Sequence, residues 1–297
     1  MITLETGRLR VDLPEPGERP NDSCRFDRAG YIAEVVLDGG MHFCASEPRN
    51  LVHPSSGGRG LCNEYRFDVS SEAGVGEYFP KFGVGLIRKE DSKGYLFYRA
   101  YKDVRPYEIK LSHTTDSATY VTEPEPCLGY AMRTVKNIAV NGNEITMDVE
   151  CVNAGSKNIH IQEFCHNFLS IDGMAVGSDY VLTMPAIPDQ GQGRINNRRG
   201  YSGSLRGCKH GFTFCEFTAI DTDLSVDTTS IAQDIPFKWR LEHKGARAFV
   251  EGEDWFVPGQ INVWGVDHIL SPEIVNCFTL TPGQALKWRR VWRFDIY

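Results

Sequence analysis

Apolar and polar residues alternate with a period of two along most of this chain of 297 residues. In Glu144–Val152, for example, Ile145, Met147 and Val149 fall on one face, and charged or hydroxyl-bearing side chains fall on the other. This pattern is typical of a β-strand with one buried face. The Asn-Gly pair at 141–142 just before it favours a tight hairpin turn. Stretches with the helical period of 3.6 are nearly absent, so we expect few and short helices.

Similar runs predict strands throughout the chain, separated by turn signals about every 8–12 residues, a spacing typical of β-sandwiches and barrels. No change of composition divides the chain, so we expect an all-β antiparallel sandwich in a single domain, residues 1–297. The other predicted strands are Leu9–Leu13, Arg25–Arg28, Tyr31–Leu37, Arg66–Val69, Gly94–Tyr101, Tyr107–His113, Ala118–Glu123, Met132–Val140, Asn158–Ser170, Tyr180–Met184, Gly211–Phe217, Lys238–His243, Ala248–Gly252, Gln260–Val266, Ile274–Leu280 and Leu286–Phe294.

Charge and cysteine content exclude several classes of protein. The formal net charge is −7 and the pI about 5.7, so nucleic acid and anionic membranes are not expected as partners. No apolar run approaches the roughly 18 residues of a membrane helix, and the N-terminus does not resemble a signal peptide. The nine cysteines include no Cys-x-x-Cys pair. We expect reduced thiols in a cytoplasmic protein, and no structural metal site.

One long segment, Ala186–Gly211, is polar, rich in glycine and carries four arginines. A loop of this length in a compact domain is usually functional or mobile. It is interpreted either as a solvated excursion or as a loop that overhangs a polar ligand.

The densest group of polar residues with chemical potential lies in Ile161–Gly173, which holds Glu163, His166 and Asn167 between apolar neighbours. On a regular strand, Glu163 and His166 point to opposite faces unless a bulge intervenes. Histidine titrates nearest neutrality and so suits a general acid or base. The alternative is a core histidine bonded to a backbone carbonyl.

This segment resembles a known family. His166 and the glycine seven residues later resemble the His-x-Tyr-Phe-x-Leu-x-Gly segment of the aldose 1-epimerase (galactose mutarotase-like) family. The resemblance implies that the chain is a divergent member of this family. Further segments resemble the family's other motifs in the same order along the chain: Tyr31–Gly39, Pro54–Gly60 with Phe79–Gly83, Thr134–Val152, and Leu280–Gly283 with the strand that ends at Phe294.

The resemblance implies a superhelical antiparallel β-sandwich with a sugar site on its concave sheet. It also implies that His166 protonates the ring oxygen of a cyclic sugar. An acid and a base suffice to open and close the ring, so no cofactor is expected.

The predicted catalytic base lies at a different position in this sequence than in the family. The segment Gln260–Val266, about where the family has its catalytic glutamate, contains no carboxylate. Glu273 is the predicted base, and Asp267 is the alternative. The family's earlier histidine is also missing; Lys81 or Phe82 stands at about that place, with Arg88 following.

Other side chains are predicted to bind sugar hydroxyl or phosphate groups. Glu64 precedes a predicted strand and is either a surface ion-pair partner or a sugar ligand. Trp264 could stack on the apolar face of a sugar, whereas Trp288 and Trp292 share one strand face and are expected in the core. The predicted substrate-binding residues are Glu64, Arg66, Lys81, Arg88, Glu163, Asn167 and Trp264.

The sequence thus favours an isomerase that interconverts the anomers of a monosaccharide or sugar derivative. The main alternative is a carbohydrate-binding or regulatory protein on the same fold. A third class, sandwich domains that accompany lyases or hydrolases, usually needs a second catalytic domain, for which this chain has no room. The charges of Lys81, Arg88 and the Arg-rich segment suit a phosphorylated or acidic sugar. The chain could also form a homodimer, which the sequence does not decide.

Overall fold

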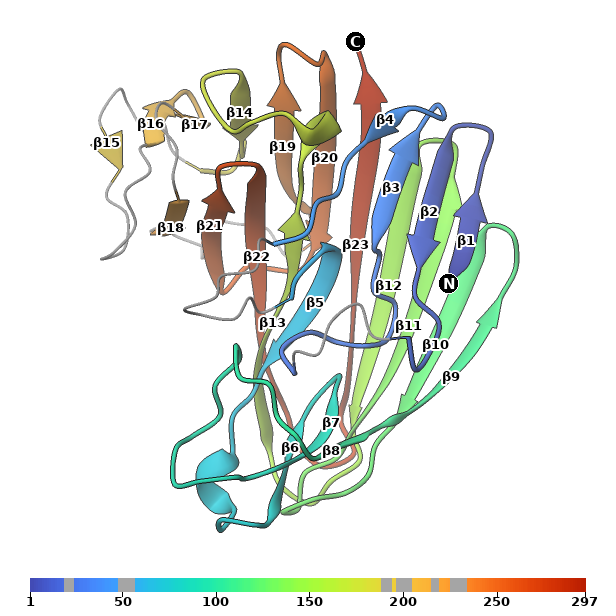
Figure 1. Ribbon diagram of the computed structural model, residues 1–297, viewed down its shortest axis with the longest axis vertical. Coiled ribbons are helices and arrows are strands. Elements are labelled where there is room, and N and C mark those ends of the chain that lie inside the picture. Colours follow the sequence, from blue (N-terminus) through green and yellow to red (C-terminus); the bar gives the residue numbers. More distant parts are fainter. Residues whose placement is uncertain (19–23, 48–56, 188–193, 196–204, 215–218, 225–233) are drawn as a thin grey trace.

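The computed structural model describes residues 1–18, 24–47, 57–187, 194–195, 205–214, 219–224 and 234–297. Their regular secondary structure consists almost entirely of strands (Figure 1). Every strand pair in the described part is antiparallel, as the alternation predicts. Two short 3-10 turns, Ser70–Glu72 (η1) and Ile171–Gly173 (η2), are the helical elements of this part of the chain.

The largest sheet has eleven strands, and the C-terminal strand β23 runs through its middle (Figure 1). In spatial order its strands are β15 (Arg194–Ile195), β16 (Leu205–Cys208), β17 (Gly211–Phe214), β14 (Tyr180–Thr183), β19 (Phe237–His243), β20 (Ala248–Trp255), β23 (Ala285–Ile296), β12 (Glu144–Asn153), β11 (Met132–Asn141), β10 (Ser117–Glu123) and β9 (Glu108–His113).

A five-stranded sheet carries the residues of most interest. Its order is β18 (Ala219–Leu224), β21 (Gln260–Val266), β22 (Ile269–Leu280), β13 (Ile159–Phe168) and β5 (Gly60–Arg66). Two smaller sheets complete the fold: β1 (Ile2–Glu5), β2 (Leu9–Leu13), β3 (Glu34–Leu37) and β4 (Met41–His42), and then β6 (Tyr78–Lys81), β7 (Gly85–Arg88) and β8 (Val104–Pro106).

The hairpin predicted at residues 141–142 is confirmed. Strands β11 and β12 pair from Asn141 opposite Glu144, and Gly142 takes the positive φ of 58° that such a tight turn needs. The predicted core positions of Trp288 and Trp292 are also confirmed, because both side chains are buried. These rings lie on the face of β23 that packs into the interior of the fold.

Three predicted strands are wrong. Residues Arg25–Arg28 form bends rather than a strand, because their backbone amides bond to single carbonyls of two different segments, Asn63 and Gly83. The strand expected at Arg66–Val69 ends instead at Arg66, where the pairing of β5 with β13 stops. The aromatic segment Gly94–Tyr101 contains no strand. Its tyrosines pack on each other instead, with Tyr95 and Tyr101 stacked at 6.0 Å.

Several other predictions concern the chain as a whole. The Arg-rich segment Ala186–Gly211 lies largely outside the described residues. Eight of the nine cysteines are described, and all eight are free thiols. Within the described ranges, no helix has the length and apolar character needed to cross a bilayer.

Candidate functional site

The two faces of strand β13 separate the polar residues of the Ile161–Gly173 segment into two groups. His166 lies between Phe164 and Phe168 on one face, whereas Glu163 and Asn167 project from the other. The prediction that Glu163 and His166 point to opposite faces is therefore confirmed, and no bulge brings them together. The face of His166 looks away from the eleven-stranded sheet, and we call it the site face.

His166 and Glu273 are in direct contact on the site face. The His166 Nε2 atom lies 3.0 Å from Oε1 of Glu273, and both side chains are only 2% exposed. Because β13 and β22 are neighbours in the sheet, two residues far apart in sequence meet without any loop having to close. The alternative base, Asp267, is exposed and bonds to His268 instead.

The other ring nitrogen of His166 is held by Ser271, two residues before Glu273. Its hydroxyl oxygen lies 2.9 Å from Nδ1 and also accepts the backbone N–H of Asn167 at 3.0 Å. A hydroxyl has one hydrogen, and Nδ1 is its only recorded acceptor within the described part of the chain. Donation to Nδ1 leaves the ring hydrogen on Nε2, where it points at the Glu273 carboxylate.

Aromatic rings surround the imidazole. The Phe168 ring stacks on it in parallel at 3.9 Å, and Trp264 meets it edge-on at 5.0 Å. Phe26 and Phe164 complete the enclosure at 5.9 and 6.1 Å. Trp264 thus lies in the site, next to His166. These apolar walls keep water from the polar pair and strengthen the electrostatic interactions inside.

Burial shifts the pKa values of the pair in opposite directions. It lowers the pKa of His166 well below its ordinary value, and the nearby guanidinium groups of Arg25 and Arg66 lower it further. Burial raises the pKa of Glu273 to about 7, although Asn262 and the same two arginines oppose the rise. Near neutral pH the pair therefore holds a proton that it can exchange, and this proton resides mainly on Glu273.

A second charged group lies next to this pair on β5. Glu64 is buried and forms an ion pair of 2.7 Å with Arg25. Burial alone would raise the pKa of Glu64, but Arg25, Lys81 and Arg66 outweigh it, and the pKa is lowered. Glu64 is therefore an ionised hydrogen-bond acceptor inside the site rather than a surface ion-pair partner.

The cations of the site differ in how they are used. The Lys81 ammonium group is buried, donates to the Tyr65 carbonyl, and has its pKa lowered to about 8 by burial. Arg66 is one-third exposed, packs 4.3 Å above the Phe164 ring, and approaches Glu273 only to 4.0 Å. Its guanidinium group thus keeps hydrogen-bonding capacity at the edge of the site.

Arg88 is not brought to the site. Its guanidinium group bonds to the Gly76 carbonyl and lies 3.5 Å from Asp103, and none of its recorded contacts involves His166 or Glu273. Its side chain is half exposed on the three-stranded sheet. The location of the Arg88 side chain therefore does not support its predicted role as a sugar or phosphate ligand.

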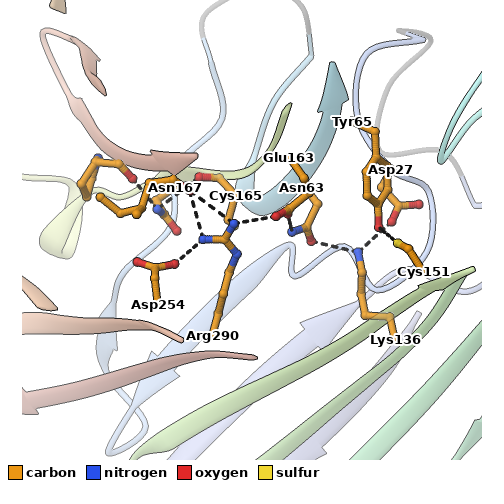
Figure 2. Close-up of polar contacts among 12 residues, drawn as sticks. Asp27, Asn63, Tyr65, Lys136, Cys151, Glu163, Cys165, Asn167, Asp254 and Arg290 are labelled. Atoms are coloured by element: carbon orange, nitrogen blue, oxygen red, sulfur yellow. Dashed lines mark hydrogen bonds and ion pairs between the residues drawn. The ribbon is translucent and has the colours of Figure 1, made fainter. Parts of the chain in front are cut away.

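Glu163 belongs to a buried polar network between the two large sheets. Figure 2 shows Arg290 between the carboxylates of Asp254 and Glu163, and the Lys136 ammonium group pointing at Asn63. Asn63 joins the two halves by donating to Glu163 at 2.6 Å.

Asn167 lies beside this network with its amide already used. It accepts from Trp292 Nε1 at 3.1 Å and donates to the Pro272 carbonyl. Glu163 and Asn167 thus support the strand that carries His166 from behind. We do not retain them as sugar ligands.

Three residues of the site were not singled out from the sequence. Arg25 falls within a predicted strand, and Ser271, two residues before Glu273, has no predicted role. Asn262 lies in the segment described as lacking a carboxylate, yet it pairs directly with Glu273 and donates to Oε2 at 3.0 Å. A signal was available for Asn262, because it is a polar residue between two apolar ones, Ile261 and Val263, within a predicted strand.

The arrangement supports proton transfer more than other chemistries. Ser271, His166 and Glu273 resemble a hydrolytic triad in composition, but Ser271 is completely buried and its oxygen is occupied by the Asn167 amide. It is therefore badly placed to attack a substrate. The described residues contain no group of three or more His, Cys, Asp or Glu side chains that could hold a metal ion.

Solved structures of the same architecture match nearly the whole chain. A galactose mutarotase related enzyme from Lactobacillus acidophilus matches with a TM-score of 0.60 and 14% identity, over 99% of this chain and 97% of its own. A galactose mutarotase-like protein from Lactobacillus casei matches with 0.60 and 11%, over 99% and 100%. An aldose epimerase homologue from C. elegans matches with 0.54 and 12%, over 99% and 98%.

No family model and no curated protein matches the sequence. At these low identities the structural likeness establishes the fold alone. The chain has the galactose mutarotase-like fold, and the all-β antiparallel architecture expected from its motifs is confirmed.

Proposed function

We propose that this protein is an aldose 1-epimerase-like isomerase, which interconverts the anomers of a monosaccharide or a close derivative. One observation carries the proposal: the 3.0 Å contact between His166 Nε2 and Glu273 Oε1, enclosed by aromatic rings on one face of a sheet. General acid–base chemistry at a sugar's anomeric centre needs two such groups within reach of two oxygens on one carbon.

The reaction needs only protons to move. Glu273 takes the hydrogen of the anomeric hydroxyl while His166 gives a proton to the ring oxygen. The bond between C1 and the ring oxygen breaks, and C1 becomes an aldehyde. After rotation about C1–C2, the reverse steps close the ring with the hydroxyl on the other side. Protons and electrons balance over the cycle, so the residues need no cofactor to complete it.

The resting protonation of the pair fits this cycle. The exchangeable proton resides mainly on Glu273, whose pKa is raised to about 7. Because Nε2 already carries the ring hydrogen, transfer of this proton to the imidazole ends on Nδ1, and the Ser271 hydroxyl turns to accept from it. That transfer produces the imidazolium acid and the carboxylate base together. Glu64, Arg66, Lys81 and Trp264 line the same region and are proposed to bind the sugar.

The alternative is a carbohydrate-binding or regulatory protein that holds a sugar without turning it over. The enclosure of His166 and Glu273, each 2% exposed, is the observation that favours it, because a catalytic pair must meet its substrate. In the epimerase proposal, the Arg25 and Phe26 side chains that pack over Glu64 and His166 move when the sugar enters.

Magnetisation-transfer NMR between α and β anomers tests the proposal across a panel of neutral aldoses, sugar phosphates and uronic acids. We expect accelerated exchange for one class, reduced about 10²–10⁴-fold in His166→Asn and in Glu273→Gln. Arg289→Ala, an exposed change on the other sheet, is the control and keeps full activity. Sugar binding without accelerated exchange would instead establish the binding protein.

We further propose a cytoplasmic location, in keeping with nine cysteines of which the eight described are free. A monosaccharide or sugar derivative is the proposed partner, and nucleic acid and membranes are not. The homodimer stays an open prediction that sedimentation velocity can decide.

A further inference from the structure

Asn262 carries a buried acceptor that nothing in the described part of the protein satisfies. Its side chain is 4% exposed, and its Oδ1 atom has no hydrogen-bond partner there. Leaving a buried polar atom unpaired destabilises the fold, so such an atom calls for an explanation. The position of Asn262 supplies one, because it lies directly opposite Glu273 on the neighbouring strand and so shares the site face.

The orientation of the amide is determined by its neighbours. Its nitrogen lies 3.0 Å from Oε2 of Glu273 and 3.3 Å from Oδ1 of Asp221. In this orientation the amide nitrogen can donate to both carboxyl groups, whereas the reverse orientation would set the amide oxygen against both, with only the one proton of Glu273 to bridge them and none for Asp221. The unpartnered atom is therefore the oxygen. The missing partner must be a hydrogen-bond donor.

The surroundings indicate which donor it is. Trp264, two residues along the same strand and on the same face, meets the ring of His166, so the free oxygen belongs to the site itself. Two carboxylates already lie beside the Asn262 amide. A neutral O–H fits a place that is already rich in acceptors and needs no new charge to be buried. A sugar hydroxyl is such a donor.

We propose that Asn262 is a specificity-determining residue that accepts a hydrogen bond from one hydroxyl of the bound sugar, other than the anomeric one. The inference rests on the proposed function only in taking the ligand to be a sugar. The amide nitrogen holds Glu273 in place, while the hydrogen bond to the amide oxygen distinguishes sugars by the presence and orientation of one hydroxyl. A sugar that lacks this hydroxyl, or carries it on the other side of the ring, leaves Oδ1 unpaired and binds more weakly.

The test uses sugars that cannot mutarotate, so that binding is separated from catalysis. 1,5-Anhydroglucitol, 1,5-anhydrogalactitol and their analogues lacking one hydroxyl at a time are titrated calorimetrically into the wild type and Asn262→Leu. We expect one missing hydroxyl to weaken wild-type binding about 5- to 160-fold, the range that an unsatisfied buried acceptor predicts. In Asn262→Leu the parent sugar binds correspondingly worse, and removal of that same hydroxyl has no further effect.

Asn276→Leu is the matched control. Asn276 lies on β22 opposite Glu163, so its side chain projects from the other face of the sheet, where its own buried amide nitrogen is unpartnered. We expect this variant to keep the wild-type pattern among the analogues. Should Asn262→Leu fail to fold, Asn262→Ala takes its place.

The outcomes separate this inference from the proposed function. Equal discrimination among the analogues in wild type and Asn262→Leu would overturn the role of Asn262 and leave the sugar site intact. Failure of every anhydro sugar to bind the wild type, together with no accelerated exchange for any sugar in the panel, would overturn both.

Discussion

The Ser271 hydroxyl oxygen lies 2.9 Å from Nδ1 of His166, on the opposite side of the ring from Glu273. The Asn167 backbone amide occupies one lone pair of this oxygen, and in this arrangement the hydroxyl hydrogen goes to Nδ1. The imidazole is then held at both nitrogens. Its one hydrogen points at the group with which it is proposed to exchange protons.

This arrangement predicts the tautomer of His166. In Glu273→Leu the carboxylate no longer influences the ring, and Ser271 alone should keep the hydrogen on Nε2. In the double variant Ser271→Ala/Glu273→Leu that preference disappears. One net hydrogen bond of about 0.5–1.5 kcal/mol corresponds to a change of roughly 2- to 13-fold in the tautomer ratio. Nitrogen-15 spectra of labelled histidine measure the ratio without substrate. A hydrogen found on Nδ1 in Glu273→Leu would contradict the assignment.

The activity should depend on pH through the proton that the pair shares. Because the pKa of Glu273 is raised to about 7, the pair loses this proton as the pH rises past that value. We expect kcat/KM for anomer exchange to fall to about half its maximum near pH 7 and to keep falling above it. Removing a donor to the ionised carboxylate raises its pKa, so Asn262→Leu should move this decline to higher pH. A decline that stays at the same pH in the variant would argue against Glu273 as its source.

The pairing of His166 with Glu273 illustrates what sequence reasoning could reach. Alternation along the segment predicted the strand and the face of His166, since these depend only on local periodicity. The family resemblance predicted His166 as the acid. Glu273 was predicted as the base because it is the glutamate nearest to the position of the family's catalytic glutamate. The contact itself depends on which strands are neighbours in the sheet, and alternation carries no information on strand order.

Arg25 and Arg88 show why the remaining site residues were harder to predict. Arg25 was read as part of a strand, but it enters the site because the backbone of its segment bonds to two separate parts of the fold. The family resemblance and its charge favour Arg88 as a ligand, yet its guanidinium group bonds to the Gly76 carbonyl and lies near Asp103. Both outcomes depend on contacts between residues distant in sequence, which local patterns do not contain.

The free hydrogen-bonding capacity of Arg66 predicts a preference for anionic sugars. Its guanidinium group is one-third exposed at the edge of the site and has no close carboxylate partner among the described residues, Glu273 being 4.0 Å away. Arg66→Gln should weaken the binding of sugar phosphates or uronic acids by about tenfold and leave neutral aldoses nearly unchanged.

Arg88→Gln, which removes the same charge away from the site, is the control for this prediction. The preference of the wild type for the anion should also decrease as salt is added, because Arg66 is partly exposed. Equal affinities for neutral and anionic sugars at low salt would contradict the prediction.

The buried Arg290 predicts a large effect on stability rather than on chemistry. It lies between the carboxylates of Glu163 and Asp254, and removing it leaves both without their cation. We expect Arg290→Met to lower the free energy of unfolding by about 3–5 kcal/mol. Its neighbour Arg289 forms an exposed pair with Asp148 on the other face of the same strand, so Arg289→Met should cost no more than about 1 kcal/mol. Urea unfolding measures the loss in the free energy of unfolding for the two variants, which change neighbouring residues of the same strand. Equal losses would mean that the network between the sheets contributes no more than a surface ion pair.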